Sequence, residues 1–303
     1  MKATNVTLSL RQRAFELDRS NIPEQVSTAR TLAHTMMGSH FARHAHREAL
    51  DFINSIGTTQ FAEYEGSLHT TTSTPQSQVE PIPKPYGLKG GAAREALIET
   101  LGLRAPETPR DLDLIRRGSH FTPHDEAIAR TLMPRDYRYG ARVELITDLN
   151  RYLTSRDITI NEVAILDGSL HASPLALLDT IGQVLRPSRY RGGTLHREPG
   201  ISGRTLLKMI RLQAEGTLRG ESWSVIGIPL ETSFSDIDLA IHLNKAFQHS
   251  KAAAGLFASY CSTLGLIAPD REPLEYLLTE LAHLGHGEES LLRDVPREEI
   301  PKL

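Results

Sequence analysis

The chain has 303 residues, which predicts two or three compact units of about 100–150 residues each. A formal charge of −3 excludes a protein that coats nucleic acid through its overall charge, although a local basic groove remains compatible with it. The single cysteine, Cys261, excludes an intramolecular disulfide framework and a cysteine-rich zinc site. No run of residues approaches the roughly 20 apolar positions of a membrane-spanning helix. We therefore expect a cytoplasmic protein without membrane contact, and a protein exported by a specialised secretion system would have the same composition.

Four segments follow one another along the chain. Apolar residues at roughly helical spacing predict a helical N-terminal arm over residues 1–66. Residues 67–85 carry a Thr/Ser run and four prolines, which predict a linker or surface loop. Residues 86–200 mix strands and helices, and residues 201–303 are again mostly helical. The sequence therefore predicts an α+β fold with a helical arm before it and a helical region after it.

The individual helices are predicted as follows. Helical spacing in the arm runs over residues 9–56, with Pro23 in the first turn of a helix. Three helices are expected in the C-terminal region, over residues 203–215, 235–264 and 272–283.

The central segment opens with a strand, a glycine turn and a helix over residues 86–97. Gly90 and Gly91 permit unusual backbone dihedrals and let another group approach the bare backbone. Amides at the start of the following helix carry a positive partial charge that suits a phosphate. Lys89 and Arg94 add full positive charges on either side. From this segment alone, an anion site and a purely structural turn stay equally open.

Two carboxylates follow about 20 residues later, at Asp111 and Asp113. Side chains alternate between the faces of a strand, so both aspartates are expected on one face and Leu112 and Leu114 on the other. Neighbouring carboxylates repel each other unless a cation lies between them, and Mg²⁺ prefers such oxygen ligands. The pattern predicts a divalent metal site, with a solvent-exposed strand face as the alternative.

These motifs resemble the polymerase-β-type nucleotidyltransferases, and in particular the head domain that class II CCA-adding enzymes share with bacterial poly(A) polymerases. The resemblance rests on GGxxR at Gly90–Arg94, DxD at Asp111–Asp113, the block Ser155-Arg156-Asp157-Ile-Thr-Ile-Asn161-Glu-Val-Ala-Ile165, the triplet Leu177-Leu-Asp179 and the helix Leu206–Ala214. The motifs occur in the family's order and extend over a little under half of the chain. The resemblance implies a mixed or antiparallel sheet flanked by helices.

By that resemblance, each matched residue has an implied role. Asp111 and Asp113 are the catalytic carboxylates and bind two metal ions, Mg²⁺ or Mn²⁺. The residues implied to bind the nucleoside triphosphate are Gly90, Gly91, Arg94, Arg156, Asp157 and Asn161. Nucleotidyl transfer needs little from the protein beyond placement and charge stabilisation, which suits this set of residues.

One departure from the family concerns recognition of the base. The family uses an acidic-acidic-x-x-Arg motif just before its last helix, and Ile201–Thr205 has no acidic pair. Arg204 and Lys208 lie one helical turn apart and are candidates for a contact with the nucleotide, together with Arg211. These residues belong to a basic stretch, residues 186–219, with eight basic and two acidic side chains. A nucleotide- or RNA-binding surface and a solvated basic face both stay open.

A second departure lies between Asp113 and Ser155. The segment 125–132 has a helical pattern, and the segment 142–146 has the pattern of a strand that carries Glu144. Glu144 is a candidate third metal ligand or a polar strand residue, and both interpretations stay open.

We therefore expect an enzyme that transfers a nucleoside monophosphate from an NTP to a hydroxyl acceptor. The expected acceptor is RNA, such as a tRNA 3′ end, although the altered base-reading motif and a helical region shorter than the family's argue against ordinary CCA addition. One alternative is a toxin or effector that nucleotidylates a protein, and another is a non-catalytic, nucleotide-binding regulatory protein. The arm at residues 1–66 is expected to bind a protein partner or to mediate self-association.

Overall fold

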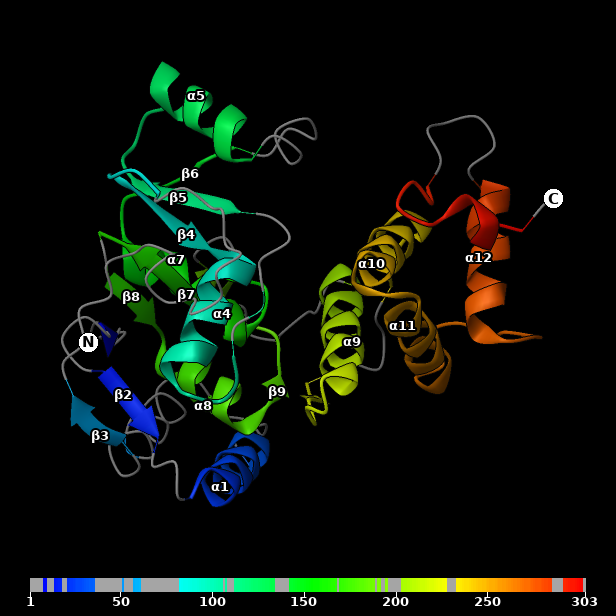
Figure 1. The fold of residues 1–303 in the computed structure, drawn as a ribbon, viewed down its shortest axis with the longest axis horizontal. Coiled ribbons are helices and arrows are strands. Elements are labelled where there is room, and N and C mark those ends of the chain that lie inside the picture. The colour runs from blue at the N-terminus through cyan, green and yellow to red at the C-terminus, as the bar shows by residue number, and fades with distance from the viewer. Residues whose placement is uncertain are drawn as a thin grey trace. The chain divides into compact units, whose positions relative to one another are not determined.

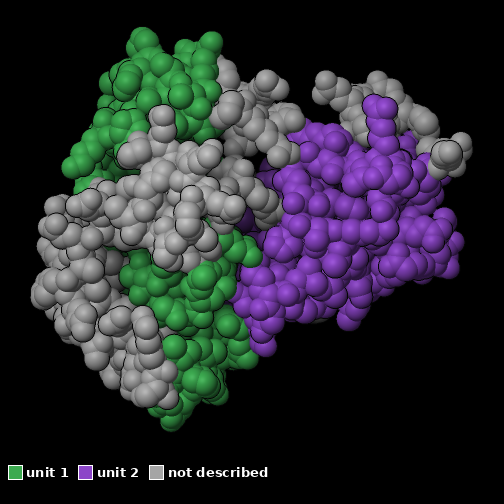
Figure 2. Space-filling view, in the orientation of Figure 1, with its two compact units in different colours: residues 1–184, 188–197 green, residues 185–187, 198–303 purple. Residues whose placement is uncertain are grey.

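The computed structural model describes two compact units (Figure 2), formed by residues 1–184 with 188–197 and by residues 185–187 with 198–303. The residues described are 8–9, 14–17, 21–35, 51, 57–60, 82–105, 107, 112–133, 142–167, 169–188, 190–191, 194–195, 203–227, 233–284 and 291–301.

The first unit is built on a six-stranded mixed sheet (Figure 1). Across the sheet the strands are β1 (Leu8–Ser9), β8 (Ser169–Ala172), β7 (Val163–Leu166), β4 (Tyr86–Lys89), β5 (Asp113–Arg117) and β6 (Glu144–Ile146). Neighbouring strands run antiparallel, except for β5 and β6, which are parallel. The α+β class expected from the sequence is confirmed.

Strand β4 lies between β5 and β7, and its residues are packed tightly. Leu88 is fully buried and lies in register with Leu114 on one side and Ile165 on the other. A Cβ at Gly87 would lie 1.9 Å from the Ile165 carbonyl oxygen, so only glycine fits at this position. Helix α4 (Gly90–Thr100) begins directly after β4 and packs against β4 and β7 (Figure 1). The end of β4 and the start of α4 are thereby held rigidly in the middle of the unit.

The helical expectation for residues 9–56 is only partly correct. Helix α1 (Ile22–Thr35) has Pro23 in its first turn, as expected. Ala14–Leu17, however, is strand β2, which pairs antiparallel with β3 (Gly57–Gln60). Phe15 and Leu17 are two residues apart, a spacing that fits a strand as well as a helix, and the distant pairing partner decides between them.

Helix α1 packs against α8 (Pro174–Gly182), a helix whose residues are all buried. Arg30 Nε donates to the Gly182 carbonyl at 3.0 Å, and its Nη2 donates to Gln183 Oε1 at 3.1 Å. A Cβ at Gly182 would lie 2.9 Å from the Arg30 backbone nitrogen, so the two helices approach to backbone contact. This face of the expected arm is therefore covered by the chain's own α8.

Two of the remaining elements of the first unit lie where the sequence analysis expects them. Helix α5 (Pro123–Leu132) and strand β6 occur where the sequence predicts a helix and a strand. Helix α7 (Leu149–Thr154) comes directly before the block that resembles the family, and the short helix η1 (Thr159–Asn161) lies within that block. Strands β10 (Tyr190–Arg191) and β11 (Thr194–Leu195) pair antiparallel across two residues.

The second unit is mostly helical. Its helices are α9 (Gly203–Leu218), α10 (Asp236–His249), α11 (Lys251–Thr263), α12 (Pro273–Leu284) and η2 (Arg297–Glu299). Its short strand β12 (Ser224–Val225) pairs with β9 (Val184–Leu185), a strand of which only Leu185 belongs to this unit. The single helix expected from residue 235 to 264 is broken at Ser250, whose backbone is extended and whose hydroxyl accepts from the Ala253 N–H at 3.0 Å. Within the described part of the chain, no helix combines the length and the apolar character needed to cross a bilayer.

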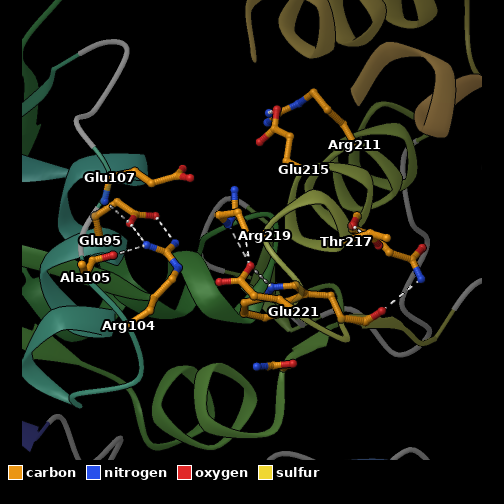
Figure 3. A network of polar contacts seen from close by, with 12 residues as sticks. Glu95, Arg104, Ala105, Glu107, Arg211, Glu215, Thr217, Arg219 and Glu221 are labelled. Atoms are coloured by element: carbon orange, nitrogen blue, oxygen red, sulfur yellow. Dashed lines mark hydrogen bonds and ion pairs between the residues drawn. The ribbon is translucent and has the colours of Figure 1, made fainter. Parts of the chain in front are cut away.

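Ion pairs stabilise segments of each unit separately (Figure 3). In the first unit, both oxygens of Glu95 accept from Arg104, at 2.7 and 3.0 Å, and the Glu107 N–H donates to the same carboxylate. These hydrogen bonds hold the segment between α4 and β5 against α4. In the second unit, the Glu221 carboxylate accepts a hydrogen bond from Arg219 Nη2 at 2.7 Å, and this bond stabilises the turn after α9.

Candidate functional site

The turn from β4 into α4 brings a bare backbone against a carboxylate. Lys89 and Asp113 are register partners on β4 and β5, so Gly90 follows directly beside Asp113. Gly90 has a φ of 63°, a conformation that side chains disfavour. A Cβ at this position would lie 2.6 Å from Asp113 Oδ2. Glycine is therefore required both by the backbone conformation and by the approach of the carboxylate.

The variant Gly90→Ala disturbs the contact between Gly90 and Asp113. Gly90→Ala is expected to abolish most of the activity proposed below, because the added methyl group would displace the Asp113 carboxylate. The left-handed backbone at this position would also lower the free energy of unfolding by about 1–2 kcal/mol once the residue carries a side chain. Gly102→Ala is the matched control, since Gly102 has a φ of 66° and no described neighbour within 4 Å of an added Cβ. Both variants should lose similar stability in thermal melts, and only Gly90→Ala should lose activity. Equal activity in the two variants would contradict the assignment.

Gly91 lies beside a cation at the start of α4. Apart from the adjacent residues and the backbone of α4 itself, the nearest heavy atom to a Cβ at Gly91 would be Arg94 Nη2, at 4.0 Å. The first amides of a helix have no partner within the helix and carry a positive partial charge. Open backbone, the helix terminus and a guanidinium thus occur together here, which is a suitable environment for a phosphate.

Arg94 is connected to the block that resembles the family. Its Nη1 donates to Asn161 Oδ1 at 3.0 Å, and Asn161 Nδ2 donates to Asp157 Oδ1 at 2.9 Å. The Ile158 N–H donates to the same Asp157 oxygen at 2.9 Å. Asn161 is buried whereas Asp157 is exposed, so the buried amide orients both an arginine and an exposed carboxylate.

Glu144 lies between two cations. Lys89 Nζ is 2.7 Å from Glu144 Oε2, and Arg156 Nη2 donates to Glu144 Oε1 at 3.2 Å. Burial raises the pKa of Glu144, but attraction by Lys89 and Arg156 outweighs burial, and the pKa is lowered. Glu144 is therefore an ionised carboxylate whose two oxygens are both engaged by protein cations. Of the two interpretations left open by the sequence, this geometry favours the polar strand residue over the third metal ligand.

Tyr152 is a component of the site that the sequence reasoning missed. Its ring stacks under the Arg156 guanidinium at 3.9 Å, and its carbonyl accepts from Arg156 Nε at 3.1 Å. Burial raises the pKa of the Tyr152 phenol, and the charges of Glu144 and Asp113 raise it further. The hydroxyl is buried without a hydrogen-bond partner among the described residues. The only sequence signal was the spacing of four residues between Tyr152 and Arg156 around the end of a helix.

The expected metal ligands are described only in part. Asp111 lies outside the described residues, so its placement on the same face as Asp113 stays a prediction. Among the residues that the structure describes, no three His, Cys, Asp or Glu side chains gather as a metal-binding group. Asp113 fits a metal ligand because its carboxylate faces bare backbone at Gly90, whereas Glu144 would first have to leave Lys89 and Arg156.

The other three residues expected at the nucleotide belong to the second unit. Arg204, Lys208 and Arg211 lie on α9, and Arg211 is buried in an ion pair with Glu215. Arg186, another member of the basic stretch, is also buried. The stretch is therefore not a uniformly exposed basic face, and the first unit by itself holds the site built around Gly90 and Asp113.

No protein-family model matches this chain, and a search of curated proteins returns no match either.

Proposed function

We propose that the first unit is a metal-dependent nucleotidyltransferase head that transfers a nucleoside monophosphate from an NTP to a hydroxyl. The observation that carries the proposal is the close approach of Gly90 to the Asp113 carboxylate at the start of α4. The start of a helix and a carboxylate lie next to each other here, and this supports the proposal because transfer from a triphosphate needs groups that bind phosphate beside a ligand for a cation.

The proposed reaction needs accurate placement more than it needs covalent chemistry. The acceptor oxygen bonds to the α-phosphorus as the bond to pyrophosphate breaks, and the hydroxyl proton is released. The amides at Gly90 and Gly91 and the guanidinium of Arg94 are proposed to hold the triphosphate. Asp157, oriented by Asn161, is exposed and is proposed to accept a hydrogen bond from a ribose hydroxyl.

Asp113, together with Asp111, is proposed to hold Mg²⁺ or Mn²⁺. A bound metal would neutralise phosphate charge and favour ionisation of the acceptor hydroxyl. Within the chain, Lys89 and Arg156 keep Glu144 ionised and fixed at the edge of β6. We propose that Arg156 acts through Glu144 and Tyr152, since these two residues engage its guanidinium.

RNA is the acceptor that we propose, by the resemblance of the head motifs to enzymes that extend RNA 3′ ends. The order of strand, glycine turn, helix and carboxylate-bearing strand supports this comparison. The nucleotide preference stays open, because the family's acidic base-reading pair is missing at Ile201–Thr205.

The test is a transfer assay with the full chain. The protein is incubated with each α-labelled NTP, Mg²⁺ or Mn²⁺ and total cellular RNA, and the label is then traced. Label in RNA is the expected result. Label in protein would support the toxin or effector alternative instead, and NTP binding without any transfer would support a regulatory protein.

A further inference from the structure

The side chain of Lys89 reaches across a strand of the sheet to its ionic partner. Lys89 lies on β4 and Glu144 on β6, with β5 between the two strands. Neighbouring strands lie about 4.8 Å apart, so the two backbones are separated by roughly 10 Å. Lys89 Nζ nevertheless lies 2.7 Å from Glu144 Oε2. The Lys89 side chain is therefore extended across β5.

The face of β5 that Lys89 crosses is the face that carries Asp113. Lys89 and Asp113 are register partners, and residues directly opposite each other on neighbouring strands point to the same face. Glu144 is in register with Ile115, which lies two residues after Asp113 and so shares its face. Gly90, the first residue of α4, directly follows Lys89. The Lys89 ammonium thus lies on the face of the proposed metal ligand, and its backbone adjoins the proposed phosphate-binding turn.

The two cations that engage Glu144 differ in how firmly they are held. Arg156 donates to Glu144 from two nitrogens, at 3.2 and 3.4 Å, and to the Tyr152 carbonyl at 3.1 Å, and its guanidinium stacks on the Tyr152 ring. Lys89 contacts Glu144 through a single point charge on a flexible four-carbon stem. Lys89 can therefore leave Glu144 while Arg156 stays and continues to compensate the carboxylate.

The pair of Lys89 and Glu144 is also weak enough to exchange. The Lys89 side chain is 20% exposed and the Glu144 side chain is 32% exposed, and partly exposed ion pairs contribute little to stability. A triphosphate carries several negative charges, and its oxygens accept strong hydrogen bonds from an ammonium group. A triphosphate that binds beside Gly90 would therefore compete with Glu144 for Lys89 and would have the greater charge.

We propose that Lys89 is a further triphosphate-binding residue, and that Glu144 is an internal competitor which holds its ammonium until the NTP arrives. The inference rests on the proposed function and deepens it, because it adds a cation and a competing carboxylate to the same site. It also has a consequence that a purely structural ion pair lacks. Removing the Glu144 charge should strengthen the binding of a triphosphate, whereas the loss of a structural contact would weaken binding or leave it unchanged.

The test is calorimetric titration of the full-length protein with inorganic tripolyphosphate in excess Mg²⁺. Lys89→Gln should lower the affinity about tenfold, because a charge-assisted hydrogen bond is lost. Glu144→Gln should raise the affinity by up to about fivefold, which is the most that a partly exposed ion pair would withhold. This gain should be absent in the double variant Lys89→Gln/Glu144→Gln, because Lys89 is the group that Glu144 competes for. Lys89→Arg keeps the charge and should retain most of the affinity.

The matched controls come from another ion pair of the same unit, Arg117 with Asp167 at 2.9 Å. Arg117→Gln and Asp167→Asn change the net charge in the same way as Lys89→Gln and Glu144→Gln, and both should bind tripolyphosphate like the wild type. Equal gains in Asp167→Asn and Glu144→Gln, a gain that survives in the double variant, or no gain in Glu144→Gln would overturn the proposal. So would the absence of binding by the wild type.

A second arm distinguishes the triphosphate from the phosphates of an RNA backbone. The anisotropy of a labelled short single-stranded RNA should respond equally to the wild type and to Lys89→Gln. A loss confined to RNA, with tripolyphosphate affinity unchanged, would overturn the proposal and assign Lys89 to the acceptor.

These binding measurements can fail or succeed independently of transfer. If no NTP yields labelled product while the tripolyphosphate affinities change as expected, then the proposed function fails and the role of Lys89 stands. If label is transferred and Lys89→Gln retains the wild-type KM for the NTP, then the inference fails and the proposed function stands.

Discussion

Replacing Asp113 with Asn is expected to lower nucleotidyl transfer by at least about 10³-fold while leaving the fold intact. The amide has nearly the same shape as the carboxylate, so the contact with Gly90 is retained and only the charge is lost. Without that charge, the proposed site loses its ligand for Mg²⁺ or Mn²⁺ beside Gly90, whose backbone is proposed to bind phosphate. The measurement is the rate of label transfer at saturating NTP and metal, beside a thermal melt.

The control is Asp167→Asn, which removes a carboxylate from the same sheet region. Asp167 is exposed, pairs with Arg117 at 2.9 Å and has a φ of 55°, a conformation that asparagine also tolerates. Its variant should transfer label at the wild-type rate. Transfer that survives in a double variant of Asp111 and Asp113 would overturn the metal assignment. Loss of transfer in Asp167→Asn as well would show that the assay reports net charge and not a site.

Replacing Asp125 with Ala is expected to destabilise the first unit by about 3–5 kcal/mol, the usual cost of breaking a buried ion pair from one side. Asp125 has no exposed surface, and its carboxylate accepts from the Arg116 guanidinium, from the Tyr86 hydroxyl at 2.9 Å and from the Thr122 N–H at 2.7 Å. Removing it leaves these donors, including a charged guanidinium, without their shared acceptor. Urea denaturation at pH 7 measures the loss.

Two milder variants provide the comparison. Tyr86→Phe removes one hydrogen bond to Asp125 and should cost about 1 kcal/mol. Arg130→Gln breaks the exposed pair with Glu126 on α5 and should cost less than about 0.5 kcal/mol. If Asp125→Ala costs no more than Arg130→Gln, then the hydrogen bonds that join Asp125 on α5 to Tyr86 on β4 and Arg116 on β5 do not stabilise the unit.

The same network predicts how stability depends on pH. The hydrogen bond from Arg116 lowers the pKa of Asp125 well below its ordinary value of 3.8, against the opposing effect of burial. A lowered folded-state pKa contributes stability that is fully present above the unfolded pKa and is lost as the pH falls toward the folded one. The difference in unfolding free energy between wild type and Asp125→Ala should therefore be full at pH 7 and smaller at pH 3.

Much of the candidate site could be predicted from short-range patterns. The pair Gly90-Gly91 indicated a special turn because glycine tolerates dihedrals that other residues avoid, and the turn does have a φ of 63° at Gly90. The helix over residues 125–132 and the strand at Glu144 were also expected from their periodicity, and both are present. Where a residue's type alone restricts the backbone, the local sequence is sufficient.

Partners across the fold could not be predicted in the same way. The pairing of Glu144 with Lys89 depends on β6 lying parallel to β5, while β5 lies antiparallel to β4. Nothing in the spacing of 55 residues between the two side chains indicates that arrangement. Tyr152 was missed for the same reason, since its closeness to Asp113 arises from the packing of α7 against the sheet core.

The sequence by itself determined the chemical groups of this protein: a glycine pair flanked by Lys89 and Arg94, and two carboxylates at Asp111 and Asp113. These follow from residue type and from the periods of helices and strands, which act over a few residues. Only the tertiary structure decided which of these groups meet. It placed Asp113 against Gly90, engaged Glu144 with Lys89 and Arg156, paired β2 with β3, and put Arg204, Lys208 and Arg211 in a separate unit. Such contacts depend on strand order and burial between distant segments, and no local pattern encodes them.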